Sequence, residues 1–158
     1  MRNCSSKMKE IAFIILATIV AGCLYGVTGK QMSMDELMKD GKQNIDNENF
    51  TYTYDYKSLN DGDTVIIKDT IHSKEIRGND TFLTFESNST LGMYFIGNLT
   101  DFNAGDKVKI VLHISRDTFV KTYGAQTWSF DFEIFEEGWD FDQHMPIPFP
   151  PSVIKHVR

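Results

Sequence analysis

After residue 50 the chain alternates between apolar or aromatic side chains and polar ones, and this period of two constrains the fold more than any other feature. In residues 50–57 (FTYTYDYK), aromatic rings alternate with Thr, Asp and Lys. The same alternation recurs in residues 107–115 and 128–136. Because successive side chains of a β-strand point to opposite faces of its sheet, this pattern predicts strands with one buried face. We therefore expect an all-β domain.

Six segments are candidate strands, and short turns rich in Asn, Asp, Gly and Ser separate them. They are residues 50–57, 64–72, 81–87, 93–99, 107–115 and 128–136. Within the last two, one face is expected to carry Val108, Ile110, Leu112 and Ile114, and Trp128, Phe130, Phe132 and Ile134, respectively. Short strands at close spacing, without an amphipathic helix between them, predict a small barrel or a sandwich.

The same turn motif precedes two of these segments. Residues 60–71 (NDGDTVIIKDTI) and 103–114 (NAGDKVKIVLHI) share six of their twelve positions. In both, the glycine permits a tight turn and the aspartate is expected to bind nearby backbone amides. We interpret the two motifs as one way of beginning a strand, used twice.

A Gly-Asp turn followed by alternating Val and Ile resembles the start of the first and fourth strands of OB-fold barrels. The resemblance implies that the last five candidate strands are strands one to five of the barrel. Residues 50–137 are therefore expected to form a small OB-fold-like barrel of five or six strands. Residues 97–108 (GNLTDFNAGDKV) are also similar to the connection between strands three and four of the membrane-anchored OB-fold haem chaperone of cytochrome c maturation.

This second resemblance implies a candidate haem site at the end of the barrel. That family attaches haem at a His-x-x-x-Tyr motif, and His144 is the nearest equivalent of its histidine. The motif's tyrosine is missing, and the nearest aromatic residue, Phe149, follows five residues after His144 rather than four. His and Met residues also serve as axial haem ligands, but the neighbouring His144 and Met145 cannot reach opposite faces of one iron.

The first 22 residues have the pattern of a secretory signal. Three basic residues precede an apolar run over residues 11–21. Residues 20–23 (VAGC) resemble the lipobox of prokaryotic lipoproteins, which implies cleavage before Cys23 and attachment of a diacylglyceryl group to its thiol. The alternative is an uncleaved anchor, because residues 11–27 are just long enough to span a bilayer. Both interpretations predict a domain tethered to the cell membrane, outside the cytoplasm.

Residues 23–49 are expected to be a polar linker that contains one short helix. Ser33 followed by Glu36 is a capping-box pattern, and Gly41 can supply a left-handed helix end. A helix over residues 34–40 is too short to be stable unless it packs against the domain.

Residues 138–158 are expected to form a proline-rich, extended tail. Its segment 145–151 (MPIPFPP) favours a polyproline-II-like conformation. Such a segment either packs along its own domain, extends as a stiff end of the chain, or binds a partner protein.

Four Asn-X-Ser/Thr sequons follow the leader, at Asn49, Asn79, Asn88 and Asn98. On an exported protein they are candidate N-glycosylation sites. Asn, Ser and Thr also cluster at the ends of β-strands because their side chains bind the local backbone. Both interpretations stay open at this point.

The composition argues against several classes of function. The 158 residues include 16 Lys+Arg and 22 Asp+Glu, a net charge of −6, which disfavours binding to nucleic acid through its phosphates. Two cysteines and four scattered histidines disfavour a structural zinc site. The sequence has neither a Gly-x-Ser-x-Gly motif nor a glycine-rich phosphate loop, so neither an enzyme nor a cofactor is expected.

These observations predict a lipid-anchored, extracytoplasmic, non-catalytic binding or accessory protein of a bacterium or an archaeon. Its partners, apart from the membrane, are expected to be a protein, a glycan or a small molecule. Two alternatives are a haem-chaperone-like protein of cytochrome maturation and an immunoglobulin-like structural module of the cell envelope.

Overall fold

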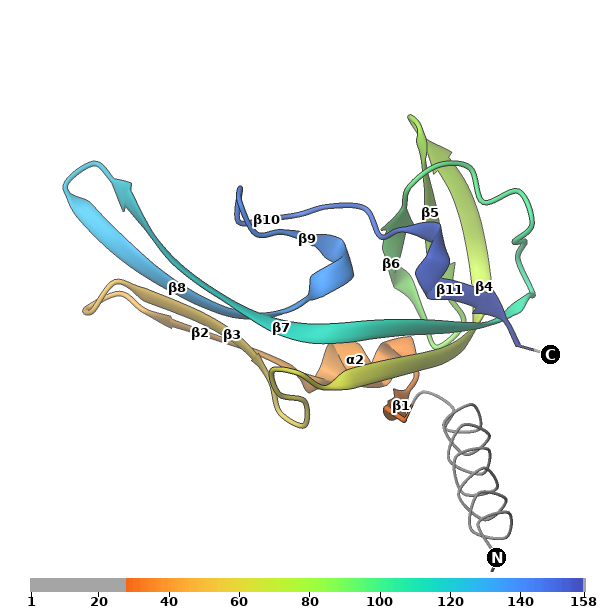
Figure 1. Ribbon diagram of the computed structural model, residues 1–158, viewed down its shortest axis with the longest axis horizontal. Coiled ribbons are helices and arrows are strands. Elements are labelled where there is room, and N and C mark those ends of the chain that lie inside the picture. The colour runs from red at the N-terminus through yellow and green to blue at the C-terminus, as the bar shows by residue number, and fades with distance from the viewer. Residues whose placement is uncertain (1–27, 158) are drawn as a thin grey trace, which may run out of the picture.

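The computed structural model describes residues 28–157, and most of this part of the chain is in β-strands (Figure 1). The strands are β1 (Lys30–Met32), β2 (Gly41–Asp46), β3 (Thr51–Tyr56), β4 (Thr64–Arg77), β5 (Asp80–Phe85), β6 (Asn88–Phe95), β7 (Lys107–Tyr123), β8 (Gln126–Phe135), β9 (Trp139–Asp140), β10 (Met145–Pro146) and β11 (Ile154–His156). One α-helix, α2 (Met34–Asp40), and two 3-10 turns, η1 (Glu136–Gly138) and η2 (Pro151–Val153), complete the described residues. The prediction of an all-β fold is confirmed.

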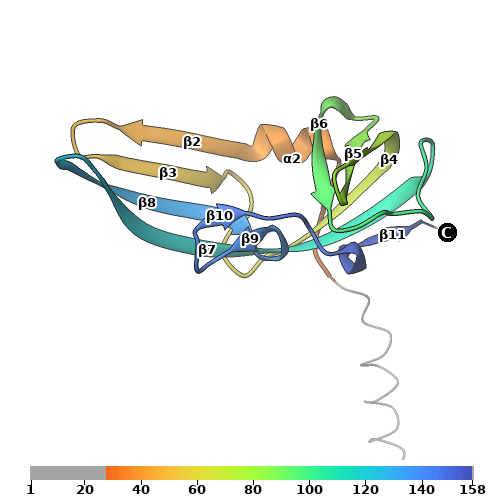
Figure 2. The same ribbon diagram turned by 90° about the horizontal axis from the view of Figure 1, so that it is seen from above.

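The main sheet has the order β2-β3-β8-β7-β4-β5-β6, and Figure 2 shows its first four strands side by side. β1 pairs in parallel with β4, and β11 pairs antiparallel with β7. Two long strands hold the sheet together because each changes partner along its length. β4 pairs first with β7 and then with β5, whereas β7 pairs first with β4 and then with β8.

The expected barrel of five or six strands is corrected in two respects. The described residues form eleven strands, because the segments on both sides of the expected domain also join the sheets. In addition, no strand pairing within residues 28–157 closes the sheet into a barrel. The edge of β8 that faces away from β7 is taken by β3, which pairs with it in parallel at Tyr52 and Phe130.

The hydrophobic core lies between the first halves of β4 and β7, strands β5 and β6, and helix α2. The predicted buried face of β7 is confirmed, since Val108, Ile110, Leu112 and Ile114 are at most 1% exposed. The largest fully buried side chains are Phe85 of β5 and Phe95 of β6. This part of the molecule has the close-packed interior that a domain without disulfides needs.

The two turn motifs adopt the same geometry, as predicted from their shared residues. Gly62 and Gly105 have φ angles of +86° and +91°, which glycine adopts without strain. The Asp63 carboxylate accepts from the Asn60 backbone N–H at 2.8 Å. The Asp106 carboxylate accepts from the Asn103 N–H at the same distance. The two long strands β4 and β7 therefore begin directly after equivalent turns.

Helix α2 confirms one prediction and corrects another. Ser33 and Glu36 form the capping box, with the Ser33 hydroxyl accepting from the Glu36 N–H at 3.2 Å. Gly41, however, has a φ of −61° and is not left-handed, because the chain passes directly into β2. Met34 and Leu37 are each 3% exposed within the core, which explains how so short a helix is stable.

The segments expected as linker and tail contribute to the folded unit. Strands β1 and β2 and helix α2 all fall within residues 23–49. Of the three interpretations of the tail, the structure shows packing along its own domain: β11 pairs with β7, and Phe149 forms a parallel bridge with Phe95 of β6. Val153 and Ile154 are buried in the core, so the end of the described chain is firmly attached.

Candidate ligand-binding groove

A groove of about 740 Å³ lies beside the core, and most of its wall is aromatic. Its floor comes from β3, β8 and the second half of β7, and one end is formed by β6. Residues 139–149, which we call the strap, lie over β7 and β8 (Figure 1), and several of them line the groove. β7 and β8 curve beneath the strap in this view, so the strap lies on the inner side of the curve. We call this hollow the aromatic groove.

The floor is built by cross-strand neighbours that share one face of the sheet. Tyr52 lies opposite Phe130, and Phe130 lies opposite Phe119. Phe119 stacks on Phe130 with ring centroids 4.9 Å apart, and Tyr52 contacts Phe132 edge-to-face at 5.3 Å. These rings are only partly buried. The sheet thus holds a rigid aromatic surface that is available to a ligand.

Asp117 of β7 fastens the strap to this floor. Its carboxylate accepts from the Trp139 indole N–H at 2.7 Å and lies 2.7 Å from Nδ1 of His144. The Asp117 side chain is 8% exposed, so both contacts are largely shielded from water. Hydrogen bonds to a buried carboxylate are among the stronger ones in proteins. One residue of the sheet therefore positions two residues of the strap.

His144 has an unusual backbone conformation that these contacts explain. Its φ is +51°, which is uncommon for a residue other than glycine. The imidazole stacks on Phe119 with ring centroids 4.1 Å apart and is held by Asp117 at Nδ1. Because side-chain contacts fix the ring from two directions, the strained backbone is maintained.

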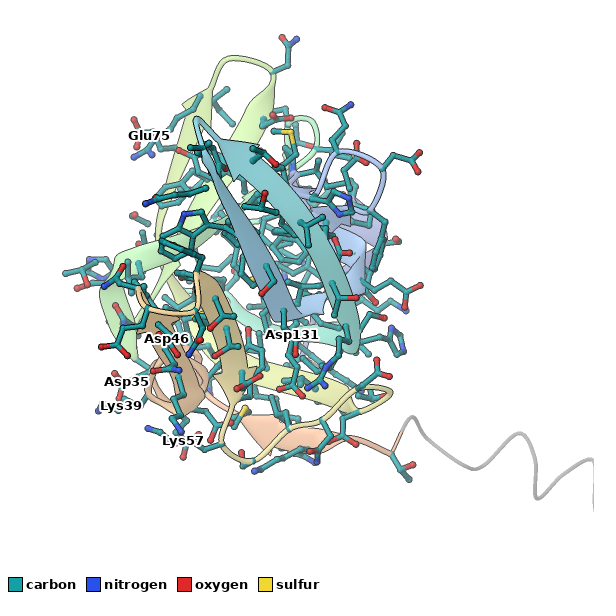
Figure 3. All side chains as sticks on the ribbon, turned by 90° about the vertical axis from the view of Figure 1, so that its left-hand side faces the viewer. Asp35, Lys39, Asp46, Lys57, Glu75 and Asp131 are labelled. Carbon is teal, nitrogen blue, oxygen red and sulfur yellow. The ribbon has the colours of Figure 1, made fainter. Side chains whose placement is uncertain are left out.

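The opposite face of the same strands is polar. There Arg116 lies 3.2 Å from Glu133 and 3.5 Å from Asp131. Figure 3 shows the molecule from the left-hand side of Figure 1 and labels Asp131, which is on β8, and Asp46, which is at the end of β2. The contrast between the two faces is the one that the alternating sequence predicts, with aromatic rings on one side and charged or hydroxyl groups on the other.

Tyr54 and Tyr56 extend the floor toward the core. Their rings meet edge-to-face with centroids 5.5 Å apart, and Tyr56 also packs against the core. Burial raises the pKa of Tyr54 above its usual value, and burial raises the pKa of Tyr56 further. Both hydroxyls are therefore neutral at physiological pH.

The predicted modification sites fall in different places. Cys23, the predicted lipidation site, lies outside the described residues. Asn49, Asn79 and Asn98 are exposed in loops between strands, whereas Asn88 begins β6 and is half-buried. The Asn88 side-chain oxygen accepts from the Leu91 N–H at 3.2 Å, and the Asn49 amide donates to Asp46 at 2.8 Å. These local bonds are of the kind expected for Asn at strand ends.

Of the predicted site residues that fall within 28–157, only His144 lines the aromatic groove. Sequence reasoning missed Asp117 and Phe119 because the predicted strand ended at Ser115. β7 in fact continues to Tyr123, and Asp117, Phe119 and Lys121 lie on the face opposite to that of Ile110, Leu112 and Ile114. The run of β-branched and aromatic residues over 118–123 is a signal from which the longer strand could have been predicted, but it does not predict this change of face. Sequence reasoning also missed Trp139, because residues 138–158 were expected to form an extended tail.

Comparisons with known proteins yield no relative: no protein-family model, curated protein or solved structure matches this chain. Within residues 28–157, no three His, Cys, Asp or Glu side chains are grouped so that they could hold a metal ion. The same part of the chain contains no helix whose length and apolar character would let it cross a membrane.

Proposed function

We propose that this protein is a membrane-tethered, extracytoplasmic accessory protein that binds a ligand in the aromatic groove without transforming it. The aromatic groove carries the proposal: partly exposed rings are fixed on a curved sheet and a strap crosses them. Concave, mostly apolar sites with a few polar groups are the usual form of small-molecule sites. The tether rests on the leader and on the lipobox-like residues that end in Cys23.

The arrangement of Asp117 and His144 supports binding rather than catalysis. A carboxylate beside a histidine can act in acid–base chemistry. Here the Asp117 carboxylate also accepts from Trp139, and the His144 ring is stacked on Phe119. Both residues thereby hold the strap in place, which is a positioning role.

We further propose that the fold is an open variant of the OB-fold. The order β7-β4-β5-β6 is that of a Greek key, in which the fourth strand returns to lie beside the first. OB-folds are partly open Greek-key barrels. In this proposal β3 takes the place on β8 that the third barrel strand would occupy. The immunoglobulin-like alternative is not retained, because the strands β4–β8 are neighbours in one continuous sheet.

Binding of the apolar fluorophore anilinonaphthalene sulfonate tests the groove. We expect saturable fluorescence enhancement with about one probe per chain, and Phe119→Ala should weaken it about fivefold or more because a stacking ring is lost. Val120→Ala is the matched control, since Val120 is the next residue of β7, is 68% exposed and lies on the opposite face. Equal affinities for the two variants would contradict the proposal.

Haem is a second candidate ligand, because the structure places His144 in the groove with its ring oriented by a carboxylate. Metal-ligating histidines commonly donate their other ring nitrogen to such a group. Hemin titration of the purified protein should then shift the Soret band, and His144→Ala should abolish the shift. A Soret band unaffected by this variant would remove haem from consideration.

The modifications are proposals as well. If Cys23 carries a diacylglyceryl group, the intact mass of membrane-extracted protein will correspond to a chain that begins at Cys23 plus lipid, and Cys23→Ala will abolish the addition. If the sequons are used, glycopeptides will contain the exposed residues Asn49, Asn79 and Asn98 in preference to the half-buried Asn88. Unmodified peptides at all four positions would refute glycosylation.

A further inference from the structure

Three lysines lie side by side on neighbouring strands at the end of the molecule opposite the groove. Lys68 of β4 is the direct partner of Lys109 of β7, and Lys109 is the direct partner of Lys155 of β11. We call these three residues the lysine row. They project from the face opposite the core, because the preceding residues Ile67 and Ile154 are buried.

The lysine row forms no ion pair with the described part of the chain. None of its three ammonium groups is within ion-pair distance of a carboxylate among residues 28–157. The outward positions of the paired segments 64–70 and 107–113 carry no acidic residue. Like charges directly opposite each other destabilise a sheet. Because three unpaired lysines stand opposite one another in a protein of net negative charge, we infer that an anionic partner binds them.

The surface around the row combines charge with apolar groups. A hollow of about 720 Å³ is lined by the three lysines together with Phe102 and Val157, and Val157 is 43% exposed. Asp101 is the one carboxylate in its wall. Basic residues next to exposed apolar ones are typical of surfaces that bind a bilayer. There the basic residues contact lipid headgroups and the apolar residues enter the boundary between headgroups and acyl chains.

The lysine row lies close to the start of the described chain, and this position indicates the membrane surface as the anionic partner. Gly29 lies directly against Thr64, at the beginning of β4. Lys68 is four residues further along the strand, a distance of about 13 Å. Cys23 is five residues before Thr28, and this stretch spans at most about 18 Å when extended. A lipid on Cys23 would therefore hold the lysine row within reach of the membrane surface.

We propose that the lysine row docks on the anionic phospholipid surface of the membrane and orients the domain on it. This inference rests on the proposed membrane tether but not on the ligand of the groove. Docking through the row leaves the groove open, because Phe119 lies ten residues beyond Lys109, about 33 Å along β7. Each lysine near an anionic surface strengthens association by about fivefold.

The test uses the full chain reconstituted in vesicles of phosphatidylcholine alone or mixed with phosphatidylglycerol. Amine labelling followed by mass spectrometry reports the reactivity of each lysine, and Lys42 and Lys57 are internal controls on another part of the molecule. We expect the lysine row to label about fivefold more slowly in the anionic vesicles only. The protection should vanish at about 1 M salt, where the Debye length falls to about 3 Å.

Equal labelling of the row in both kinds of vesicle would overturn the inference. The same protection by inorganic phosphate in zwitterionic vesicles would instead indicate a small-anion site and also overturn it. Failure of the tether has a different signature, since the chain would then not sediment with zwitterionic vesicles at all. A triple variant, Lys68→Gln, Lys109→Gln and Lys155→Gln, should lose the preference for anionic vesicles, whereas Lys39→Gln, Lys42→Gln and Lys57→Gln should keep it.

Discussion

The two halves of β7 form one continuous strand, yet their environments differ. In the first half, residues 108–114 alternate between core positions that are at most 1% exposed and the outward positions Lys109, Val111 and His113. In the second half, Phe119 is only partly buried, and Val120 and Tyr123 are 68% and 58% exposed. The first half is flanked by β4 and β11, whereas β8 is the partner of the second half.

The difference lies in what covers each half. Strands β5 and β6 and helix α2 complete a packed core over the first half, while the strap crosses the second and leaves a groove. A half-covered aromatic face buries less area and stabilises the fold less than a closed core does. We infer that the first half of β7 supplies stability and that the second half is free to serve binding.

The largest expected effect comes from truncating one ring in the core beside the first half of β7 and one ring in the groove beside the second half. Phe85→Ala, at a fully buried position, should lower the free energy of unfolding by about 4 kcal/mol, because it leaves a cavity in the core. Phe130→Ala, on the floor of the groove, should lower it by about 1 kcal/mol, since water can fill the space. Urea denaturation measures both. Similar losses for the two variants would erase the distinction between the halves.

A smaller effect is expected when the strap is released. Asp117→Asn weakens the contacts to Trp139 and His144 and should lower the free energy of unfolding by about 2 kcal/mol. It should also speed hydrogen exchange of residues 139–149 and alter the indole fluorescence. Asp142→Asn, at an exposed position of the same strap, is the control and should change stability by less than about 0.5 kcal/mol. A strap with unchanged exchange in Asp117→Asn would show that other contacts hold it.

The cap of α2 should matter less than its buried face. Ser33→Ala removes the capping hydrogen bond and should lower the free energy of unfolding by about 1 kcal/mol. Leu37→Ala empties a core position and should cost at least about twice as much. If thermal and chemical denaturation gave the reverse order, packing of the helix in the core would not be what stabilises it.

The smallest change in the free energy of unfolding is expected from the ionisation of Tyr54 and Tyr56, which extend the floor of the groove toward the core. The pKa values of Tyr54 and Tyr56 are raised by burial, so the folded chain keeps these protons longer than the unfolded chain does. Their contribution is complete below about pH 10, the usual tyrosine pKa, and is lost as the pH rises beyond it. Denaturation at pH 8 and about pH 11 should show this loss, and Tyr54→Phe with Tyr56→Phe should reduce it. A loss of the same size in the double variant would assign it to other groups.

Local features of the fold were predictable from the sequence. The alternation over residues 107–115 predicts the buried face of β7, and the Ser33–Glu36 pair predicts the start of α2. The Gly-Asp motifs predict two equivalent turns. Each of these rests on residues within a few positions of one another, where periodicity, capping and turn chemistry act directly.

The candidate site was predictable only in part, because long-range pairing creates it. His144 was singled out by a motif resemblance, but its partner Asp117 is 27 residues away along the chain and meets it through the path of the strap. The parallel pairing of Tyr52 with Phe130 joins segments that are still further apart. No local pattern specifies such neighbours.

Native-state hydrogen exchange along β7 tests the central claim most directly. Residues 108–110 lie between β4 and β11 and their apolar side chains are in the closed core, so we expect the amides of these residues to exchange only through global unfolding. Backbone amides of residues 117–123 that point away from β8 should exchange orders of magnitude faster. Uniform protection from residue 108 to residue 123 would contradict the division into a stabilising half and a binding half.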